Sequence, residues 1–379
     1  MDKTNLFVTC GPLLEGPLMD ELRSLGFSKL KQGCRGVYVD DATITDCYRI
    51  NYCSRIATRV LWPLIRFRCP NRDALYNNAR QVPWEKIVSQ RATIAIDSNV
   101  SGNTQLRNSH FAGLVIKDAV CDSLRELRGT RPNVDVENPD VQLNLYVAGG
   151  AATLSLDTSG KPLHKRGYRQ EGGEAPLQEN LAAAILMLIG YQGTGVLCDP
   201  LCGSGTFLIE AALIATKTMP GYLRQRWGFQ SHPHFRQEEW LRTKNTEDQQ
   251  RQPLPQGLLY GVDSKNTVLE GCRKNLRAAG FLKEVALQHG DFDQLLPTLN
   301  TEWVVTNPPY GTRLGKPANV ASVYRQLGEA IKRCKSSSLV FGILLPETSA
   351  SSSLDLPVKK VISLSNGGIP IHLVQGMLK

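Results

Sequence analysis

The chain has 379 residues, which at ~150 residues per domain predicts two or three domains, each with a core of its own. Hydrophobic residues make up 41% and charged residues 21%, beside 33 Gly and 21 Pro, and this balance excludes a disordered or fibrous protein. Lys and Arg (44) outnumber Asp and Glu (35). The net charge of +9 favours a polyanionic partner such as nucleic acid.

The sequence shows neither a membrane span nor an export signal. The longest apolar run, Leu181 to Ile189, is shorter than the ~20 residues that cross a bilayer, and no basic head with an apolar core begins the chain. Its ten Cys have no CxxC pair, which indicates reduced thiols and neither a disulfide framework nor a zinc or other metal site. We expect a soluble cytosolic protein.

The N-terminal part alternates between strand and helix patterns. Apolar runs predict a small α+β unit over residues 1–60, and four-residue spacing predicts a helix from Ile44 to Val60 whose basic flank is either solvated or in contact with RNA. Residues 61–158 contain further strands and a helix from Phe111 to Leu127. Asp157 to Gly173 is polar, basic and rich in glycine, so we place a boundary there and assign residues 159–379 to a third domain.

This third domain has the alternating strands and helices of a doubly wound α/β fold. Its expected strands, which build a parallel sheet, are Gly195–Asp199, Leu258–Asp263, Val285–Gln288, Trp303–Thr306 and Leu339–Leu345. Two further strands around Ser365 to Gly368 predict a C-terminal antiparallel hairpin. A long insert, residues 217–256, holds aromatic and basic residues, and either contacts substrate or forms a helical cap with buried aromatics.

Polar residues follow four of the predicted strands. After the first strand, Asp199 to Thr206 (DPLCGSGT) offers glycines for a tight turn and a carboxylate for a cationic group, although such a turn is also a plain connection. Asp263 ends the second strand, where it either accepts from ribose hydroxyls or caps a helix. Asp291 and Phe292 follow the third strand and suit an adenine, or form an exposed turn.

The fourth strand ends in Asn307-Pro308-Pro309-Tyr310. The two prolines fix the backbone and remove two donors, and the Asn307 amide oxygen accepts hydrogen bonds, which predicts a rigid acceptor site for an NH2 group. Tyr310 is placed to stack on a planar base.

With these motifs in this order, residues 170–379 resemble the class I (Rossmann-like) methyltransferases that use S-adenosylmethionine, in the amino-methylating group marked by [DN]PP[YF]. The resemblance implies that Asp199, Gly203 and Gly205 line the methionine part of the cofactor, Asp263 the ribose and Asp291 the adenine. The cofactor-binding residues that we expect are Asp199, Leu201, Cys202, Gly203, Gly205, Thr206, Asp263, Asp291, Phe292 and Asn307. The catalytic residues that we expect are Asn307, Pro308, Pro309 and Tyr310.

The N-terminal half resembles the ferredoxin-like plus THUMP arrangement of RNA-modifying enzymes, most clearly at Phe111 to Ala119 and Arg131 to Asp135. The whole chain is similar to the RlmL-type guanine-N2 methyltransferases of 23S rRNA, although the enterobacterial form continues into a second methyltransferase unit where this chain stops. The resemblance implies an RNA partner. Basic residues expected to contact RNA are Lys117, Arg131, Lys165, Arg166, Arg169, Arg224 and Arg226.

Three functions remain open at this point. The leading one is methylation of a guanosine N2 amine in 23S rRNA. Because the acceptor site serves any planar NH2 group, N6-adenine methylation of RNA or DNA and methylation of a protein glutamine amide are alternatives. An RNA-binding assembly factor without catalytic activity is the third.

Overall fold

The computed structural model describes residues 3–103, 105–171, 176–309 and 317–379. These residues form two compact units. The first comprises Met1–Cys10, Leu18–Leu163 and Arg224–Thr246, and the second comprises Gly11–Pro17, His164–Leu223 and Glu247–Lys379. Part of the predicted insert therefore belongs to the first unit, although its sequence lies between elements of the second.

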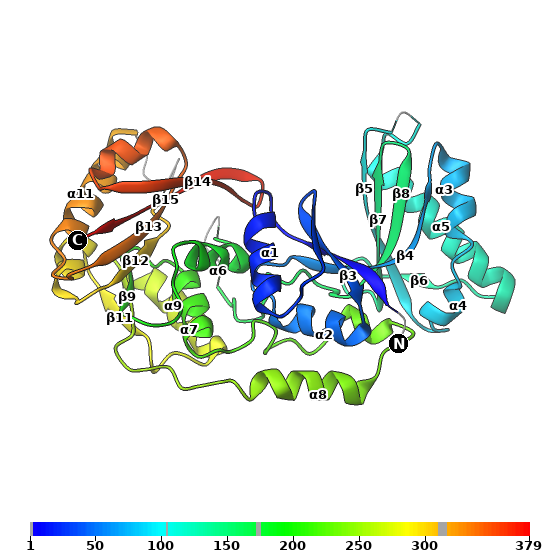
Figure 1. Cartoon of the computed structure of the whole chain (residues 1–379), viewed down its shortest axis with the longest axis horizontal. Helices are drawn as coiled ribbons and strands as arrows, with labels where there is room; N and C mark the ends of the chain where they lie inside the picture. The colour runs from blue at the N-terminus through cyan, green and yellow to red at the C-terminus, as the bar shows by residue number, and fades with distance from the viewer. Residues whose placement is uncertain (1–2, 104, 172–175, 310–316) are drawn as a thin grey trace. The chain divides into compact units, whose positions relative to one another are not determined.

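The first unit contains an eight-stranded sheet in the order β2-β3-β1-β4-β8-β7-β5-β6 (Figure 1). Neighbouring strands are antiparallel except that β5 runs parallel to β7 and β6. The strands are β1 (Thr4–Thr9), β2 (Leu30–Gly33), β3 (Gly36–Ala42), β4 (Arg59–Arg68), β5 (Thr93–Ser101), β6 (Asn133–Val134), β7 (Val141–Ala148) and β8 (Ala151–Asp157). The helices of this part of the chain are α1 (Glu15–Ser24), α2 (Ile44–Cys53), α3 (Arg72–Ala79), α4 (Trp84–Ile87) and α5 (Ser109–Arg128).

Helix α2 is shorter than the sequence pattern predicts. The expectation of a helix to Val60 is wrong, because α2 ends at Cys53 and Val60 lies in β4. The carboxylate of Glu21, from α1, accepts hydrogen bonds from the backbone N–H groups of Arg55 (2.6 Å) and Ile56 (3.3 Å). A side chain distant in sequence thus takes the donors that would have continued the helix.

The insert completes the core of the first unit. It contributes the 3-10 helix η1 (Gly228–Ser231) and most of α8 (Gln237–Asp248). Ring centroids of Tyr48 and Phe229 lie 4.8 Å apart, and those of Tyr52 and Trp240 lie 5.5 Å apart. Trp227 stacks on Phe229 at 5.4 Å. These aromatic side chains are buried, as the helical-cap interpretation of the insert requires.

The second unit contains a seven-stranded sheet in the order β11-β10-β9-β12-β13-β15-β14 (Figure 1). The five strands from β11 to β13 are parallel, and β15 runs antiparallel to both β13 and β14. The strands are β9 (Leu197–Asp199), β10 (Leu259–Asp263), β11 (Ala286–His289), β12 (Trp303–Thr306), β13 (Leu339–Leu345), β14 (Val358–Asn366) and β15 (Ile369–Leu378). The predicted α/β fold with a C-terminal hairpin is confirmed.

Helix α6 (Glu179–Leu188) precedes β9, and further helices follow the parallel strands. These are α7 (Thr206–Ala215), α9 (Asn266–Ala279), α10 (Phe292–Leu295) and α11 (Pro317–Lys332), with 3-10 helices η2 (Leu296–Thr298) and η4 (Thr348–Leu354). The strand order reverses at β9, which lies between β10 and β12. In open parallel sheets the crevice at such a reversal, outside the carboxyl ends of the strands, is where ligands bind.

Candidate active site

A cavity of about 1040 Å³ lies at the carboxyl ends of β9, β10, β11 and β12. Its volume is at the upper end of the roughly 300–1,000 Å³ that small-molecule sites occupy. The lining includes Asp199, Leu201, Cys202, Gly203, Thr206, Asp263, Asp291, Phe292, Asn307 and Pro309 from the predicted set. Gly205 and Pro308 are not part of the lining, and Tyr310 lies outside the described residues.

The turn between β9 and α7 depends on two glycines in the left-handed region, Gly203 (φ 53°) and Gly205 (φ 80°). A Cβ on Gly205 would lie 2.5 Å from the Sγ of Cys272, so only glycine lets the turn approach α9 this closely. A Cβ on Gly203 would meet no atom within 4 Å, and this residue lines the cavity. The turn is therefore packed on one side and open to a ligand on the other.

Asp199 is a buried carboxyl at the end of β9, with an exposed fraction of 2%. Burial raises its pKa to about 7, against the lowering effect of the hydrogen bond from the Leu201 N–H (3.2 Å), and the nearby Asp263 raises it further. A cation bound beside Asp199 would favour the ionised carboxylate.

Asp263 fixes the position of the glycine turn. Its Oδ2 accepts from the backbone N–H of Gly203 at 3.2 Å, and its Oδ1 accepts from the N–H of Lys265 at 2.9 Å. The N-cap residue of α9 is Lys265 and not Asp263, so the structure does not support the helix-cap interpretation. Because a carboxylate has about four acceptor positions, Asp263 retains capacity toward the cavity that it lines.

Asp291 and Phe292 lie at the start of α10, where both line the cavity. The Asp291 carboxylate is exposed and makes no hydrogen bond within the described part of the chain. The ring of Phe292 is half-buried and packs on the core of the second unit. An acceptor thus stands beside an apolar face, the pair that an adenine requires.

Asn307 has a buried amide oxygen that is not paired. Its Oδ1 has no hydrogen-bond partner among the described residues, although buried polar atoms are nearly always paired. Asn307 and Pro309 line the cavity, and Pro308 between them is buried. An unpaired hydrogen-bond acceptor in the wall of a cavity can accept a hydrogen bond from a bound ligand.

Sequence reasoning missed Asn275, which connects the turn to the segment before α6. The side chain is 1% exposed, and its Oδ1 accepts from the backbone N–H groups of Gln170 (2.8 Å) and Glu171 (3.1 Å). Its Nδ2 donates to the carbonyl oxygens of Glu171 (3.0 Å) and Ser204 (2.9 Å). The sequence did hold one indication of this role, since Asn275 places a polar amide on the apolar face of the helix pattern of α9.

Arg169 makes a second connection at the same place. Its Nη2 donates to the carbonyl oxygen of Leu177 (2.8 Å) and to the Oγ1 of Thr206 (3.2 Å), and its Nε donates to Glu179 at 2.9 Å. The side chain is thereby engaged in holding Leu177, a lining residue, beside the start of α7.

The structure divides the other basic residues expected to contact RNA. Arg166 is 1% exposed, with its Nε 3.6 Å from the Glu210 carboxylate, and this burial is incompatible with a phosphate contact. Arg224 donates to the backbone carbonyl oxygens of Ser159, Lys161 and Pro162. Both side chains therefore hold the protein's own structure.

Four basic residues remain at the surface. Ion pairs are made by Lys117 with Asp118 (2.8 Å), by Arg131 with Asp122 (2.8 Å) and by Arg226 with Asp140 (3.0 Å). Lys165 is exposed and has no partner in the described ranges.

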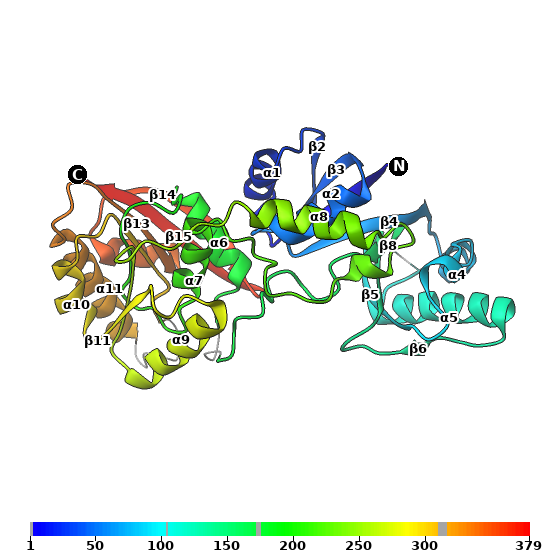
Figure 2. The same ribbon diagram turned by 90° about the horizontal axis from the view of Figure 1, so that it is seen from below.

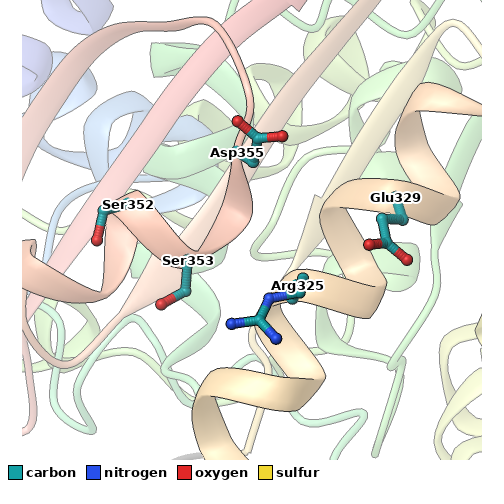
Figure 3. Close-up of a pocket in the computed structure, with 5 residues that line it drawn as sticks. All are labelled: Arg325, Glu329, Ser352, Ser353 and Asp355. Carbon is teal, nitrogen blue, oxygen red and sulfur yellow. The ribbon is translucent and has the colours of Figure 1, made fainter.

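A second cavity, of about 410 Å³, lies between α11 and η4. Figure 3 shows Arg325 and Glu329 projecting from α11 and two serines with Asp355 on the other side. Asp355 forms an ion pair with Lys332. The lining mixes charges of both signs and contains no residue of the four strand-end motifs, so we place the candidate site in the larger cavity.

Among the residues that the structure describes, no group of three or more His, Cys, Asp or Glu side chains is arranged to hold a metal ion. No helix in these ranges has the length and apolar character that crossing a membrane requires. All ten cysteines are free thiols.

Three family descriptions match the chain. The RMKL-like methyltransferase domain matches residues 166–375, the THUMP domain residues 69–157, and the RlmL ferredoxin-like domain residues 5–61. The first match covers more than half of the chain. The chain belongs to the RMKL-like methyltransferase family.

Curated relatives match most of the chain. The ribosomal RNA large subunit methyltransferase K/L of Syntrophotalea carbinolica is 37% identical over 378 residues, which are 97% of this chain and 53% of the relative. The protein of the same name from Pseudomonas aeruginosa is 38% identical over 343 residues, 88% of this chain and 47% of the relative. The chain thus spans about half the length of the curated relatives that it matches.

Solved structures are similar over nearly their full length. SMU.472, complexed with SAH, is 27% identical with a TM-score of 0.88, covering 99% of this chain and 98% of that one. A predicted N6-adenine-specific DNA methylase from Listeria monocytogenes is 25% identical with a TM-score of 0.86, at 99% and 96% coverage. TrmN from Thermus thermophilus, 19% identical with a TM-score of 0.72, shares the fold at 99% coverage of each chain.

Proposed function

We propose that the chain transfers a methyl group from S-adenosylmethionine to the N2 amine of a guanosine in 23S rRNA, in the cytosol. The family, the name of the relatives and the net charge of +9 support this function. The observation that carries it is the buried Oδ1 of Asn307, which has no partner among the described residues and lies in a cavity whose acidic side chains suit an adenosine cofactor.

The residues around the cavity fit this cofactor. Asp199 matches a cationic group, Asp263 the ribose hydroxyls and Asp291 the adenine amine. Gly203 leaves space for close approach, and a structural neighbour was solved with SAH. When bound, S-adenosylmethionine supplies an electrophilic methyl group on a sulfonium.

The chain's own residues then orient the target amine. An exocyclic amine on a purine is a poor nucleophile, because its lone pair is delocalised into the ring. The Asn307 Oδ1 accepts one amino hydrogen and so turns the nitrogen toward the cofactor side of the cavity. As positive charge develops on the nitrogen, this acceptor stabilises the transition state more than the ground state. Pro308 and Pro309 keep it in place.

Adenine N6 is the second candidate target. The similarity to the Listeria DNA methylase favours it, and an acceptor on a planar NH2 group serves either base. Of the basic residues, the half-buried Lys117 and the exposed Arg131, Lys165 and Arg226 remain proposed RNA contacts.

The test is methyl transfer by the full chain to rRNA, followed by mass spectrometry of the nucleosides. We expect N2-methylguanosine, and a loss of about 10² to 10³ in rate for Asn307→Ala with unchanged affinity for S-adenosylmethionine. Asn307→Asp keeps an acceptor and serves as the control. N6-methyladenosine alone would replace the guanine assignment. Full turnover by Asn307→Ala would remove the acceptor role, and RNA binding without any methylated nucleoside would favour the assembly factor.

A further inference from the structure

At the end that carries Tyr146, four strands of the first unit have one face covered by helices and an exposed opposite face. The strands β4, β8, β7 and β5 are neighbours in the sheet, and α3 and α5 lie together on one side of them (Figures 1 and 2). A Cβ on Gly113 of α5 would be 2.7 Å from the Oγ of Ser98, so this side is closely packed. Side chains alternate along a strand, and those flanking Ser98 therefore point to the opposite face.

This opposite face carries one large aromatic side chain among small and polar ones. Tyr146 of β7 is 44% exposed, and the strand register places it between Asn99 of β5 and Thr153 of β8. In the next row of the same face, Ala148 pairs with Ala151. These small side chains therefore leave room for a planar group to lie on the Tyr146 ring.

Two arginines border the aromatic residue on the same face. Arg66 pairs with Thr153, and Arg68 pairs with Ala151. Both are exposed, and neither makes a hydrogen bond or ion pair within the described residues. The carboxylate of Asp97 on this face is engaged by Arg59 at 3.1 Å. The positive charge beside Tyr146 is therefore not neutralised locally.

We propose that this surface, formed by Tyr146, Arg66 and Arg68 and called here the Tyr146 face, binds a single-stranded segment of RNA. A base stacks on the Tyr146 ring, and the arginines contact phosphates. One strand separates Tyr146 from the arginines, so their backbones are about 10 Å apart and the long arginine side chains reach the phosphates flanking a stacked base. An aromatic ring beside unpaired cations is the combination that single strands require.

The inference rests on the proposed function, since it assigns part of the RNA contact to this face. A duplex offers no unstacked base to Tyr146, so this face favours a single strand. A protein partner would also use an aromatic residue. However, Arg66 and Arg68 have no partner among the described residues, and Arg59 engages the Asp97 carboxylate, so the charge of this face matches a polyanion.

The test is fluorescence anisotropy of the full chain with a labelled twelve-nucleotide RNA, single-stranded or annealed to its complement. We expect Tyr146→Ala to weaken single-strand binding about tenfold or more, and Tyr146→Phe to retain it. Tyr38→Ala, at another exposed tyrosine of the same unit (36%), is the matched control and should leave affinity unchanged. Arg66→Ala with Arg68→Ala should lower the slope of log K against log salt by about one to two.

Three outcomes would overturn the assignment: no single-strand binding by the wild type, unchanged affinity in Tyr146→Ala, or equal losses on the duplex. Methyl transfer separates this inference from the proposed function. Asn307→Ala should bind the oligonucleotide normally while losing transfer. If Tyr146→Ala loses binding although the wild type methylates no RNA, the assignment of this face stands and the proposed function fails. If the wild type methylates RNA and Tyr146→Ala binds RNA normally, the proposed function stands and the assignment of this face fails.

Discussion

Cofactor affinity should depend on pH through Asp199. Burial raises the pKa of this carboxyl to about 7. At pH 6.0 most molecules hold a protonated Asp199, whereas at pH 7.5 most hold the carboxylate. A cationic cofactor binds beside the carboxylate, so affinity is lost as pH falls through 7. For a single group, the loss from pH 7.5 to 6.0 is about eightfold.

Isothermal titration calorimetry of S-adenosylmethionine at both pH values measures this effect. Binding at pH 6.0 should release close to one proton, visible as a dependence of the heat on buffer ionisation. Asp199→Asn should bind more weakly and with equal affinity at the two pH values, because an amide does not titrate. Asp291→Asn, at an exposed carboxylate of the same cavity, should retain the wild-type difference. Equal wild-type affinities, or a difference that persists in Asp199→Asn, would refute the assignment.

Two further predictions concern the walls of the cavity. Asn275→Ala leaves backbone groups of the segment before α6 and of the turn unpaired, so urea unfolding should show a loss of about 2–4 kcal/mol, with weaker S-adenosylmethionine binding; a folded variant with wild-type affinity would contradict this. Gly205→Ala adds a contact at 2.5 Å from Cys272 to its backbone strain and should cost about 2–5 kcal/mol, whereas Gly203→Ala has open space and should cost about 1–3 kcal/mol. Equal losses in the two glycine variants would show that the contact with Cys272 does not matter.

The second unit was predictable because its signals are local. Each strand is a short apolar run followed directly by its polar residues, so Asp199, Asp263, Asp291 and Asn307 could be placed at strand ends from the sequence. The rule that ligands bind outside the carboxyl ends of a parallel sheet then brings them together. Nothing in that reasoning requires knowledge of contacts between distant residues.

Features that depend on distant contacts could not be predicted. The end of α2 is set by the Glu21 carboxylate, which takes backbone donors more than thirty positions further on. The burial of Trp240 depends on Tyr52, nearly two hundred residues away. Asn275 is an ordinary polar residue in a helix pattern until the Gln170 and Ser204 backbones are known to lie beside it. In each case the contact forms between residues far apart in the sequence, so neither residue stands in a local sequence pattern that predicts it.

The path of the chain through the two units has a consequence for how the protein is made. Domains generally mature in the order in which the ribosome releases them. Here Arg224–Thr246 belongs to the first unit, yet it is synthesised after β9 and α7 of the second. During synthesis the first unit therefore cannot complete its core until Trp240 has left the ribosome, and Tyr48 and Tyr52 stay uncovered until then. If the gene were divided between Leu163 and His164, the N-terminal fragment would lack Arg224–Thr246, which belongs to the first unit. The C-terminal fragment would lack Gly11–Pro17, which belongs to the second.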